Sequence, residues 1–311
     1  MTELKNILDA KIDQYQNYYI FEPVGGLGEA YVAASLVHSF KEHYDGKVMF
    51  ITSSNSKKNL LDTFEDIDVT LVVSEEEKTQ LQDPLLNNKF IDINLYKDTE
   101  ILSKNMIDRT KMLMRLQSKN AIYSKPKPSN KAKEDANKIF NELNLNDKTV
   151  FLSTKANSCN WTAIPESFWA KLANILIEKG YNVVFNAEDG FYKYKKVFLP
   201  IDQTIEFAKL CCHSISFRSG FSDILAGISK SNLTVIYPDN NQKFSIAFTN
   251  ELLVQITKIF YEYDDSLGIV ENFLNMDLIN IVFAGKNLNQ LTYDGKDTVL
   301  LEKCINLVTS L

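Results

Sequence analysis

The chain has 311 residues, of which 45% are hydrophobic and 24% charged, and its formal net charge is −6. This composition is typical of a globular protein with more than one core and excludes a largely disordered chain, and the acidic balance argues against nucleic acid as a partner. No apolar run reaches the roughly 18 residues that cross a membrane, and the opening stretch MTELKNILDAK lacks the apolar core of a signal peptide.

Short apolar strands and amphipathic helices alternate in the first half of the chain. Strands are predicted at residues 18–24, 47–52, 68–73 and, more weakly, 90–95, and helices at 29–44, 56–64 and 102–116. Such an alternation predicts an α/β domain with a parallel sheet that helices cover on both faces.

A change of composition marks the boundary between two halves. The stretch SKPKPSNKAK at residues 124–133 has two prolines, several lysines and one apolar residue, Ala132, which indicates a surface crossing. After a helix that ends near Leu143, strands are predicted at 149–154, 181–187, 195–200 and 233–238, and a strand that passes into a turn is predicted within 213–220. Helices are predicted at 165–179, 204–212, 220–229 and 298–311. We therefore predict two α/β domains, residues 1–145 and 146–311. The sequence does not determine whether the last helix packs on the second domain or crosses back to the first.

The four cysteines and three histidines show no spacing typical of a metal site. The adjacent pair Cys211 and Cys212 falls in a helical pattern. We interpret the cysteines as buried free thiols of a protein in the reducing cytoplasm, and we expect neither a metal nor another cofactor.

The first strand ends in a loop with three glycines, Gly25, Gly26 and Gly28, and Glu29 follows at the start of a helix. Such a turn places backbone N–H groups and a helix N-terminus at the carboxyl edge of the sheet, which suits a closely approaching ligand. The glycine order matches neither the dinucleotide fingerprint nor a P-loop. Because the helix dipole stabilises a carboxylate there, Glu29 is a candidate general base. The alternative is a helix-capping glutamate without chemistry.

A second polar loop follows the strand that begins at His213. Its residues Arg218, Ser219, Gly220, Ser222 and Asp223 stand at the next strand-to-helix junction. Hydroxyl and backbone donors at a helix N-terminus, together with an arginine, suit a diphosphate group. The alternative is an Arg218–Asp223 ion pair with Ser222 as an ordinary helix cap.

A third polar loop follows the strand at 149–154, and its ligand candidates are Lys155 and Asn157. In an α/β domain this loop would leave the same sheet edge as the one at Arg218. We expect the two loops to face the same ligand.

Together these stretches resemble the GT-B glycosyltransferases, and most closely the heptosyltransferase-like group, glycosyltransferase family 9. The pair Gly28-Glu29 matches the Gly-Asp of that family's first loop, Trp161 and Pro165 match the start of its second domain, and Ser219-Gly220 match its Asp-Ser-Gly motif. The resemblance implies two Rossmann-like domains facing an interdomain cleft. It also implies a nucleoside-diphosphate-sugar donor on the second domain, and Glu29 as the base.

The sequence departs from that family at three positions in or near these motifs. Arg218 stands where the family has an acid, Asp223 stands at or near its histidine, and Asn160 stands close to where a lysine often precedes the tryptophan. The resemblance therefore does not identify a particular donor sugar, and the enzyme is expected to be hexosyl- or heptosyltransferase-like.

The leading hypothesis is an inverting, metal-independent transferase that moves the sugar to a glycan or lipid-linked acceptor. The one Asp-x-Asp stretch, at residues 66–68, leads into a strand instead of leaving one, so it is not a metal loop. One alternative is a nucleotide-sugar epimerase, in which Glu188 or Asp189 would supply a further acid–base carboxylate. Another is a non-catalytic sugar- or nucleotide-binding protein.

The stretch FYKYKKVF at residues 191–198 combines aromatic and basic side chains. It could contact the acceptor or a membrane surface, or it could be an exposed loop that leads into a strand. The sequence does not determine the oligomeric state.

Overall fold

The computed structural model describes residues 18–81, 90–94, 106–116, 121–155, 164–191, 193–228, 232–238, 288–293 and 295–310. The chain divides into two compact units, Met1–Lys127 and Pro128–Leu311. Both are built on parallel sheets, so the predicted α/β class is confirmed.

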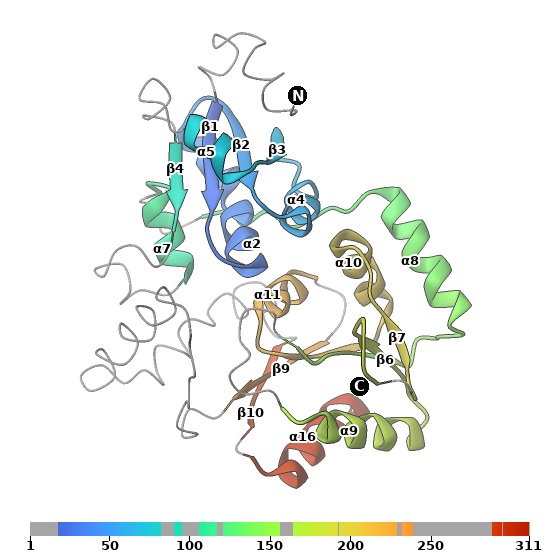
Figure 1. Ribbon diagram of the computed structural model, residues 1–311. Coiled ribbons are helices and arrows are strands. Elements are labelled where there is room, and N and C mark those ends of the chain that lie inside the picture. Colours follow the sequence, from blue (N-terminus) through green and yellow to red (C-terminus); the bar gives the residue numbers. More distant parts are fainter. Residues whose placement is uncertain are drawn as a thin grey trace, which may run out of the picture. The chain divides into compact units, whose positions relative to one another are not determined.

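The first unit contains a four-stranded parallel sheet in the order β3-β2-β1-β4 (Figure 1). Its strands are β1 (Tyr18–Pro23), β2 (Lys47–Thr52), β3 (Val69–Val72) and β4 (Phe90–Ile93). The chain runs from β1 outward through β2 to β3 and then returns to place β4 on the other side of β1. The direction of winding thus reverses between β1 and β4, and α/β sheets bind ligands outside the carboxyl ends of strands at such a point.

The helices of the first unit include α2 (Leu27–Ser35), α3 (Val37–His43), α4 (Asn55–Leu61), α5 (Glu75–Leu81) and α7 (Met106–Leu113). The helix predicted at 29–44 is divided at Leu36, whose N–H donates to the Ala33 carbonyl at 3.2 Å and tightens the turn. Helix α5 was not predicted, because its sequence has no apolar face. It begins with a capping box instead, in which Ser74 N–H donates to Glu77 at 2.8 Å and Glu77 N–H donates to Ser74 at 3.2 Å.

The second unit contains a six-stranded parallel sheet in the order β10-β9-β8-β5-β6-β7. Its strands are β5 (Thr149–Ser153), β6 (Asn182–Asn186), β7 (Lys195–Val197), β8 (His213–Phe217), β9 (Asn232–Pro238) and β10 (Leu288–Tyr293). The chain winds from β5 to β7 and then returns to the opposite side of β5 with β8. The reversal in this unit therefore lies between β5 and β8.

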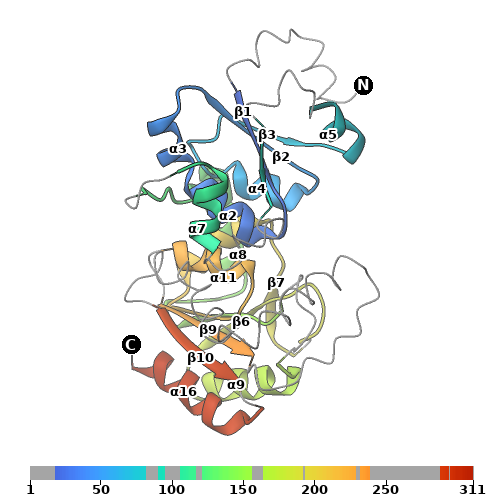
Figure 2. The ribbon, with the colours of Figure 1, turned by 90° about the vertical axis from the view of Figure 1, so that its left-hand side faces the viewer.

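Helices cover both faces of the second sheet (Figures 1 and 2). Helices α9 (Glu166–Glu178) and α16 (Asp297–Thr309) lie on one face, and α10 (Ile201–Leu210) and α11 (Gly220–Gly227) on the other. Leu300, Cys304 and Val308 of α16 are buried in one apolar cluster with residues of α9. The last helix therefore packs on the second unit.

Helix α8 (Asn130–Glu142) also belongs to the second unit, although the domain boundary predicted at residue 145 would place it in the first. It packs on α10, where the rings of Phe140 and Phe207 lie 5.6 Å apart and Gln203 donates a 3.2 Å hydrogen bond to Asp135. The buried residues of α8, Ala132, Ala136 and Phe140, lie at this contact. The proline- and lysine-rich sequence before the helix gave no sign that α8 packs on the second unit.

Because His213 is buried, we expect the free energy of unfolding of the second unit to depend on pH. His213 is fully buried on β8 and its Nε2 lies 2.8 Å from the Thr234 hydroxyl. Burial lowers the pKa of His213 from 6.5 to about 4. As the pH falls from 6.5 to 4, the unfolded chain gains a proton that the folded chain does not, so the free energy of unfolding falls by up to about 3 kcal/mol.

Urea denaturation of the wild type and of His213→Gln between pH 7.5 and pH 4 tests this expectation. The variant should lose that part of the pH dependence, whereas His43→Gln, at an exposed position, should retain it. Equal pH dependence in wild type and His213→Gln would contradict the assignment.

Candidate functional site

The glycine loop lies at the carboxyl end of β1, where the winding of the first sheet reverses. Glu29 turns back over this loop, and its Oε2 accepts a 2.8 Å hydrogen bond from Gly26 N–H. Gly25 has φ +118°, and a Cβ there would lie 2.7 Å from Glu29 Cδ. Glycine is therefore required at this position both for its backbone conformation and for the approach of the carboxylate.

The contact with Gly26 is the helix cap that the sequence left as the alternative role of Glu29. Only one carboxylate oxygen makes this bond. The other, Oε1, lies beside Gly25, whose surface is exposed. Capping and proton transfer are therefore compatible for the same side chain.

Two lysines and a further glutamate surround the end of β1. Lys57 Nζ donates to the Pro23 carbonyl at 3.2 Å, and Lys78 Nζ lies 2.5 Å from Glu22 Oε1. Burial lowers the pKa of Lys57, and the charges of Glu29 and Glu22 oppose that shift. Sequence reasoning missed these three side chains. The charged Glu22 at the end of an apolar strand was the available signal.

In the second unit, Arg218 follows β8 and folds onto the first turn of α11. Its Nη1 donates to the Ser219 carbonyl at 2.6 Å, to Ser222 Oγ at 3.2 Å and to Asp223 Oδ2 at 3.2 Å. Asp223 is fully buried. The ion pair that the sequence left as the alternative is therefore present.

The same turn carries a buried hydroxyl at the start of α11, where Gly220 is the first helical residue. Ser222 Oγ accepts from Ser219 N–H at 3.3 Å and donates to the Ser219 carbonyl at 2.6 Å. Ser219 Oγ itself is buried, and no residue in the described part of the chain forms a hydrogen bond with it.

Lys155 leaves the sheet beside this turn, because β5 and β8 are neighbours and Ser153 pairs with Ser216. Thr154 is buried and Lys155 is exposed. The structure thus brings the predicted Lys155 and Arg218 loops to the same reversal point. Asn157 and Trp161 lie outside the described residues.

Glu188 and Asp189 are exposed after β6, which is the strand next to β5 on its other side. They therefore follow a strand that borders β5 but is not itself one of the two strands, β5 and β8, between which the winding reverses.

The aromatic-basic stretch at 191–198 is largely structural. Phe191 is buried and stacks on Phe185, with ring centroids 4.0 Å apart, and the Tyr194 hydroxyl donates to Asn174 Oδ1 at 2.9 Å. Among the described residues of this stretch, Phe198 is an exposed large hydrophobic side chain, with 66% of its surface accessible.

Within the described ranges, no three histidine, cysteine or acidic side chains are grouped as metal ligands. The Asp-x-Asp stretch is occupied by other contacts, since Asp66 accepts from Ser124 at 2.5 Å and Asp68 accepts from Val48 N–H at 2.7 Å. Cys304 is buried, which raises the pKa of its thiol to about 12 and leaves it protonated at neutral pH. Among all the residues that the structure describes, no helix is long and apolar enough to cross a membrane.

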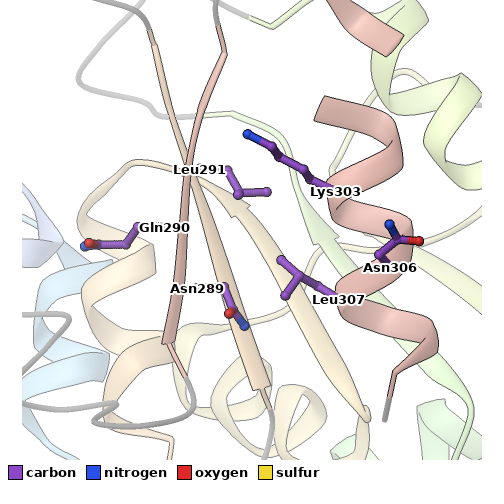
Figure 3. A pocket seen from close by; sticks show the side chains of 6 residues that line it. All are labelled: Asn289, Gln290, Leu291, Lys303, Asn306 and Leu307. Atoms are coloured by element: carbon purple, nitrogen blue, oxygen red, sulfur yellow. The ribbon is translucent and has the colours of Figure 1, made fainter. Parts of the chain in front are cut away.

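A hollow of about 290 Å³ lies between β10 and α16 (Figure 3). It is lined by Asn289, Gln290, Leu291, Lys303, Asn306 and Leu307. Because β10 is an edge strand and β9 separates it from β8, this hollow lies apart from the loops that follow β5 and β8.

No protein-family model matches the chain, and no curated protein matches its sequence. Three solved structures share its fold over nearly its whole length. ADP-heptose LPS heptosyltransferase II from E. coli has a TM-score of 0.60 and 12% identity, covering 94% of this chain and 98% of its own. A glycosyl transferase family 9 protein from Veillonella parvula has a TM-score of 0.60 and 9% identity, covering 95% and 98%.

The third structure, E. coli heptosyltransferase WaaC with ADP, has a TM-score of 0.54 and 10% identity, covering 94% of this chain and 99% of that chain. Identities this low establish the fold alone. The chain has the GT-B fold of two Rossmann-like domains that these solved structures share, as the sequence predicted.

Proposed function

We propose that the protein is a glycosyltransferase that moves a sugar from a nucleoside-diphosphate sugar to a hydroxyl group of a glycan or lipid-linked acceptor. The reaction is inverting and needs no metal ion. The observation that carries the proposal is the pair of reversal points, each of which places a polar strand-exit loop where α/β sheets bind ligands. The shared fold with heptosyltransferases supports the same class of reaction.

The second unit supplies the donor site. A departing diphosphate carries negative charge, and Lys155, Arg218 and the N-terminus of α11 place positive charge and N–H donors at one edge of the sheet. Ser219 Oγ adds a buried hydroxyl that a phosphate oxygen would satisfy.

The first unit supplies the base. Glu29 accepts the proton of the acceptor hydroxyl, and the acceptor oxygen attacks the anomeric carbon of the sugar. The bond from that carbon to the diphosphate oxygen breaks on the opposite face, so the nucleoside diphosphate leaves with the electron pair and the configuration inverts. The proton remains on Glu29 until solvent removes it.

Thermal shift with ADP, GDP, UDP, CDP and dTDP tests the donor site. Because a ligand at 100 times its Kd stabilises the folded state by about 2.7 kcal/mol, one nucleoside diphosphate should raise Tm by several degrees. The matching nucleotide sugar and a panel of glycan acceptors should then release nucleoside diphosphate at the same rate with and without EDTA.

Each other outcome of this assay has a distinct meaning. Loss of activity in EDTA would contradict the metal-independent reaction. If the nucleotide sugar is recovered with one hydroxyl group inverted, the protein is an epimerase. If it binds a nucleoside diphosphate but turns over no nucleotide sugar with any acceptor of the panel, it is a binding protein.

A further inference from the structure

The glycine loop cannot fix its own conformation. Residues 24–28 are Val-Gly-Gly-Leu-Gly, and glycine loses more conformational freedom on ordering than any other residue. Hydrogen bonds to the end of β4, to Glu29 and to Lys57 hold the backbone around the loop. Val24 N–H donates to the Ile93 carbonyl at 3.1 Å, Gly26 N–H donates to Glu29 at 2.8 Å, and the Pro23 carbonyl accepts from Lys57 Nζ at 3.2 Å.

Lys57 differs from the other two of these contacts because its donor is the charged end of a side chain that comes from another strand-exit segment. It lies in the first turn of α4, where its own N–H donates to the capping Ser54 Oγ at 3.4 Å. A cation in the first turn opposes the helix dipole. Lys57 therefore does not stabilise α4 electrostatically. Its hydrogen bond with the Pro23 carbonyl at the end of β1 gives a reason for a cation in the first turn of α4.

The charge of Lys57 also reaches the candidate base. Lys78 is already bound to Glu22 at 2.5 Å, and that hydrogen bond raises the pKa of Lys78. Lys57 is half-buried, which lowers its pKa, and the Glu29 charge is the largest of the effects that favour its protonated form. The opposite charges of Lys57 and Glu29 thus stabilise each other.

We propose that Lys57 is the positioning residue of the glycine loop: by binding the Pro23 carbonyl, it holds the loop, and with it the carboxylate that Gly26 N–H binds, in the orientation for proton abstraction. This inference rests on the proposed function. It assigns to Lys57 no contact with the donor, whose site lies on the other unit.

The variants Lys57→Met and Lys57→Arg test this role, with Lys58→Met as the matched control. Lys58 lies on the same helix and pairs with Asp62 at 2.7 Å. Because a misplacement of about 1 Å costs on the order of 10²-fold in rate, Lys57→Met should lower kcat by about 10- to 100-fold. The donor KM and the Kd for nucleoside diphosphate should stay unchanged. Lys57→Arg, which keeps the charge and the donor, should restore most of kcat, and Lys58→Met should match the wild type.

Amide hydrogen exchange of residues 24–28 gives a readout that does not need activity. Exchange of this segment should become faster in Lys57→Met and return to the wild-type rate in Lys57→Arg. An unchanged kcat, an equal loss in the arginine and methionine variants, or a raised acceptor KM at normal kcat would overturn the inference. If the wild-type chain transfers no sugar, the proposed function is wrong. If amide exchange of residues 24–28 is unchanged in Lys57→Met, Lys57 does not hold the loop, whether or not the protein is a transferase.

Discussion

Replacing Glu29 with glutamine should lower turnover by about 10²–10⁴-fold, which is the usual contribution of a general base. Glutamine keeps the length of the side chain and can still accept the hydrogen bond from Gly26 N–H through its amide oxygen. What it loses is the ability to take a proton. Tm and the affinity for the nucleoside diphosphate should therefore change little, and steady-state kinetics beside a melting curve and a binding titration measure all three.

Two further variants separate the base from the helix cap. Glu29→Ala removes both roles and should add a loss of stability of about 0.5–2 kcal/mol, the cost of a lost N-terminal cap. Glu42→Gln makes the same chemical change at a position whose side chain is 48% exposed and should behave as the wild type. Normal turnover in Glu29→Gln would show that the carboxylate only caps α2.

Replacing Arg218 with alanine should weaken binding of the nucleoside diphosphate by about 1.5–3 kcal/mol, the range for a hydrogen bond to a charged group. The structure adds a second effect, because Arg218 is the ion-pair partner of the fully buried Asp223. Removing one partner of a buried pair leaves an uncompensated charge and costs about 3–5 kcal/mol of stability. Isothermal titration and chemical denaturation should therefore both change.

The double variant Arg218→Ala with Asp223→Asn separates the two effects. Asparagine removes the uncompensated charge, so stability should recover while nucleotide affinity stays low. Lys171→Ala, which breaks the 2.8 Å pair with Asp297 between α9 and α16, controls for the general loss of a cation from this unit. A double variant that binds nucleotide like the wild type would show that Arg218 is purely structural.

The sequence by itself determined the elements that carry a strong hydrophobic period. The strand predicted at 47–52 has the same bounds as β2, and strand and helix alternate in both units as predicted, apart from α5 and β10, which were not predicted. Side chains that alternate or recur with a fixed period report the local conformation directly, because burial of one face drives both. The position of the polar loops in the chain was determined in the same way.

Elements held by polar or distant contacts were not predictable in this way. Helix α5 depends on the Ser74–Glu77 capping box, and β10 lies far along the chain from its partner β9. The sequence did not determine that α16 packs on α9. The apolar face of an amphipathic helix shows that the helix packs on another element but does not identify that element.

The candidate site shows the same division. Sequence order placed Glu29, Lys155 and Arg218 after strands, but only strand pairing put the Lys155 and Arg218 loops on neighbouring strands at a reversal point. Lys57 contacts Pro23 through the pairing of β1 with β2, and Asp223 is buried with Arg218 as its partner. A local pattern specifies which side of an element is buried, whereas the partner of each charge is decided by which strands become neighbours when the sheet forms.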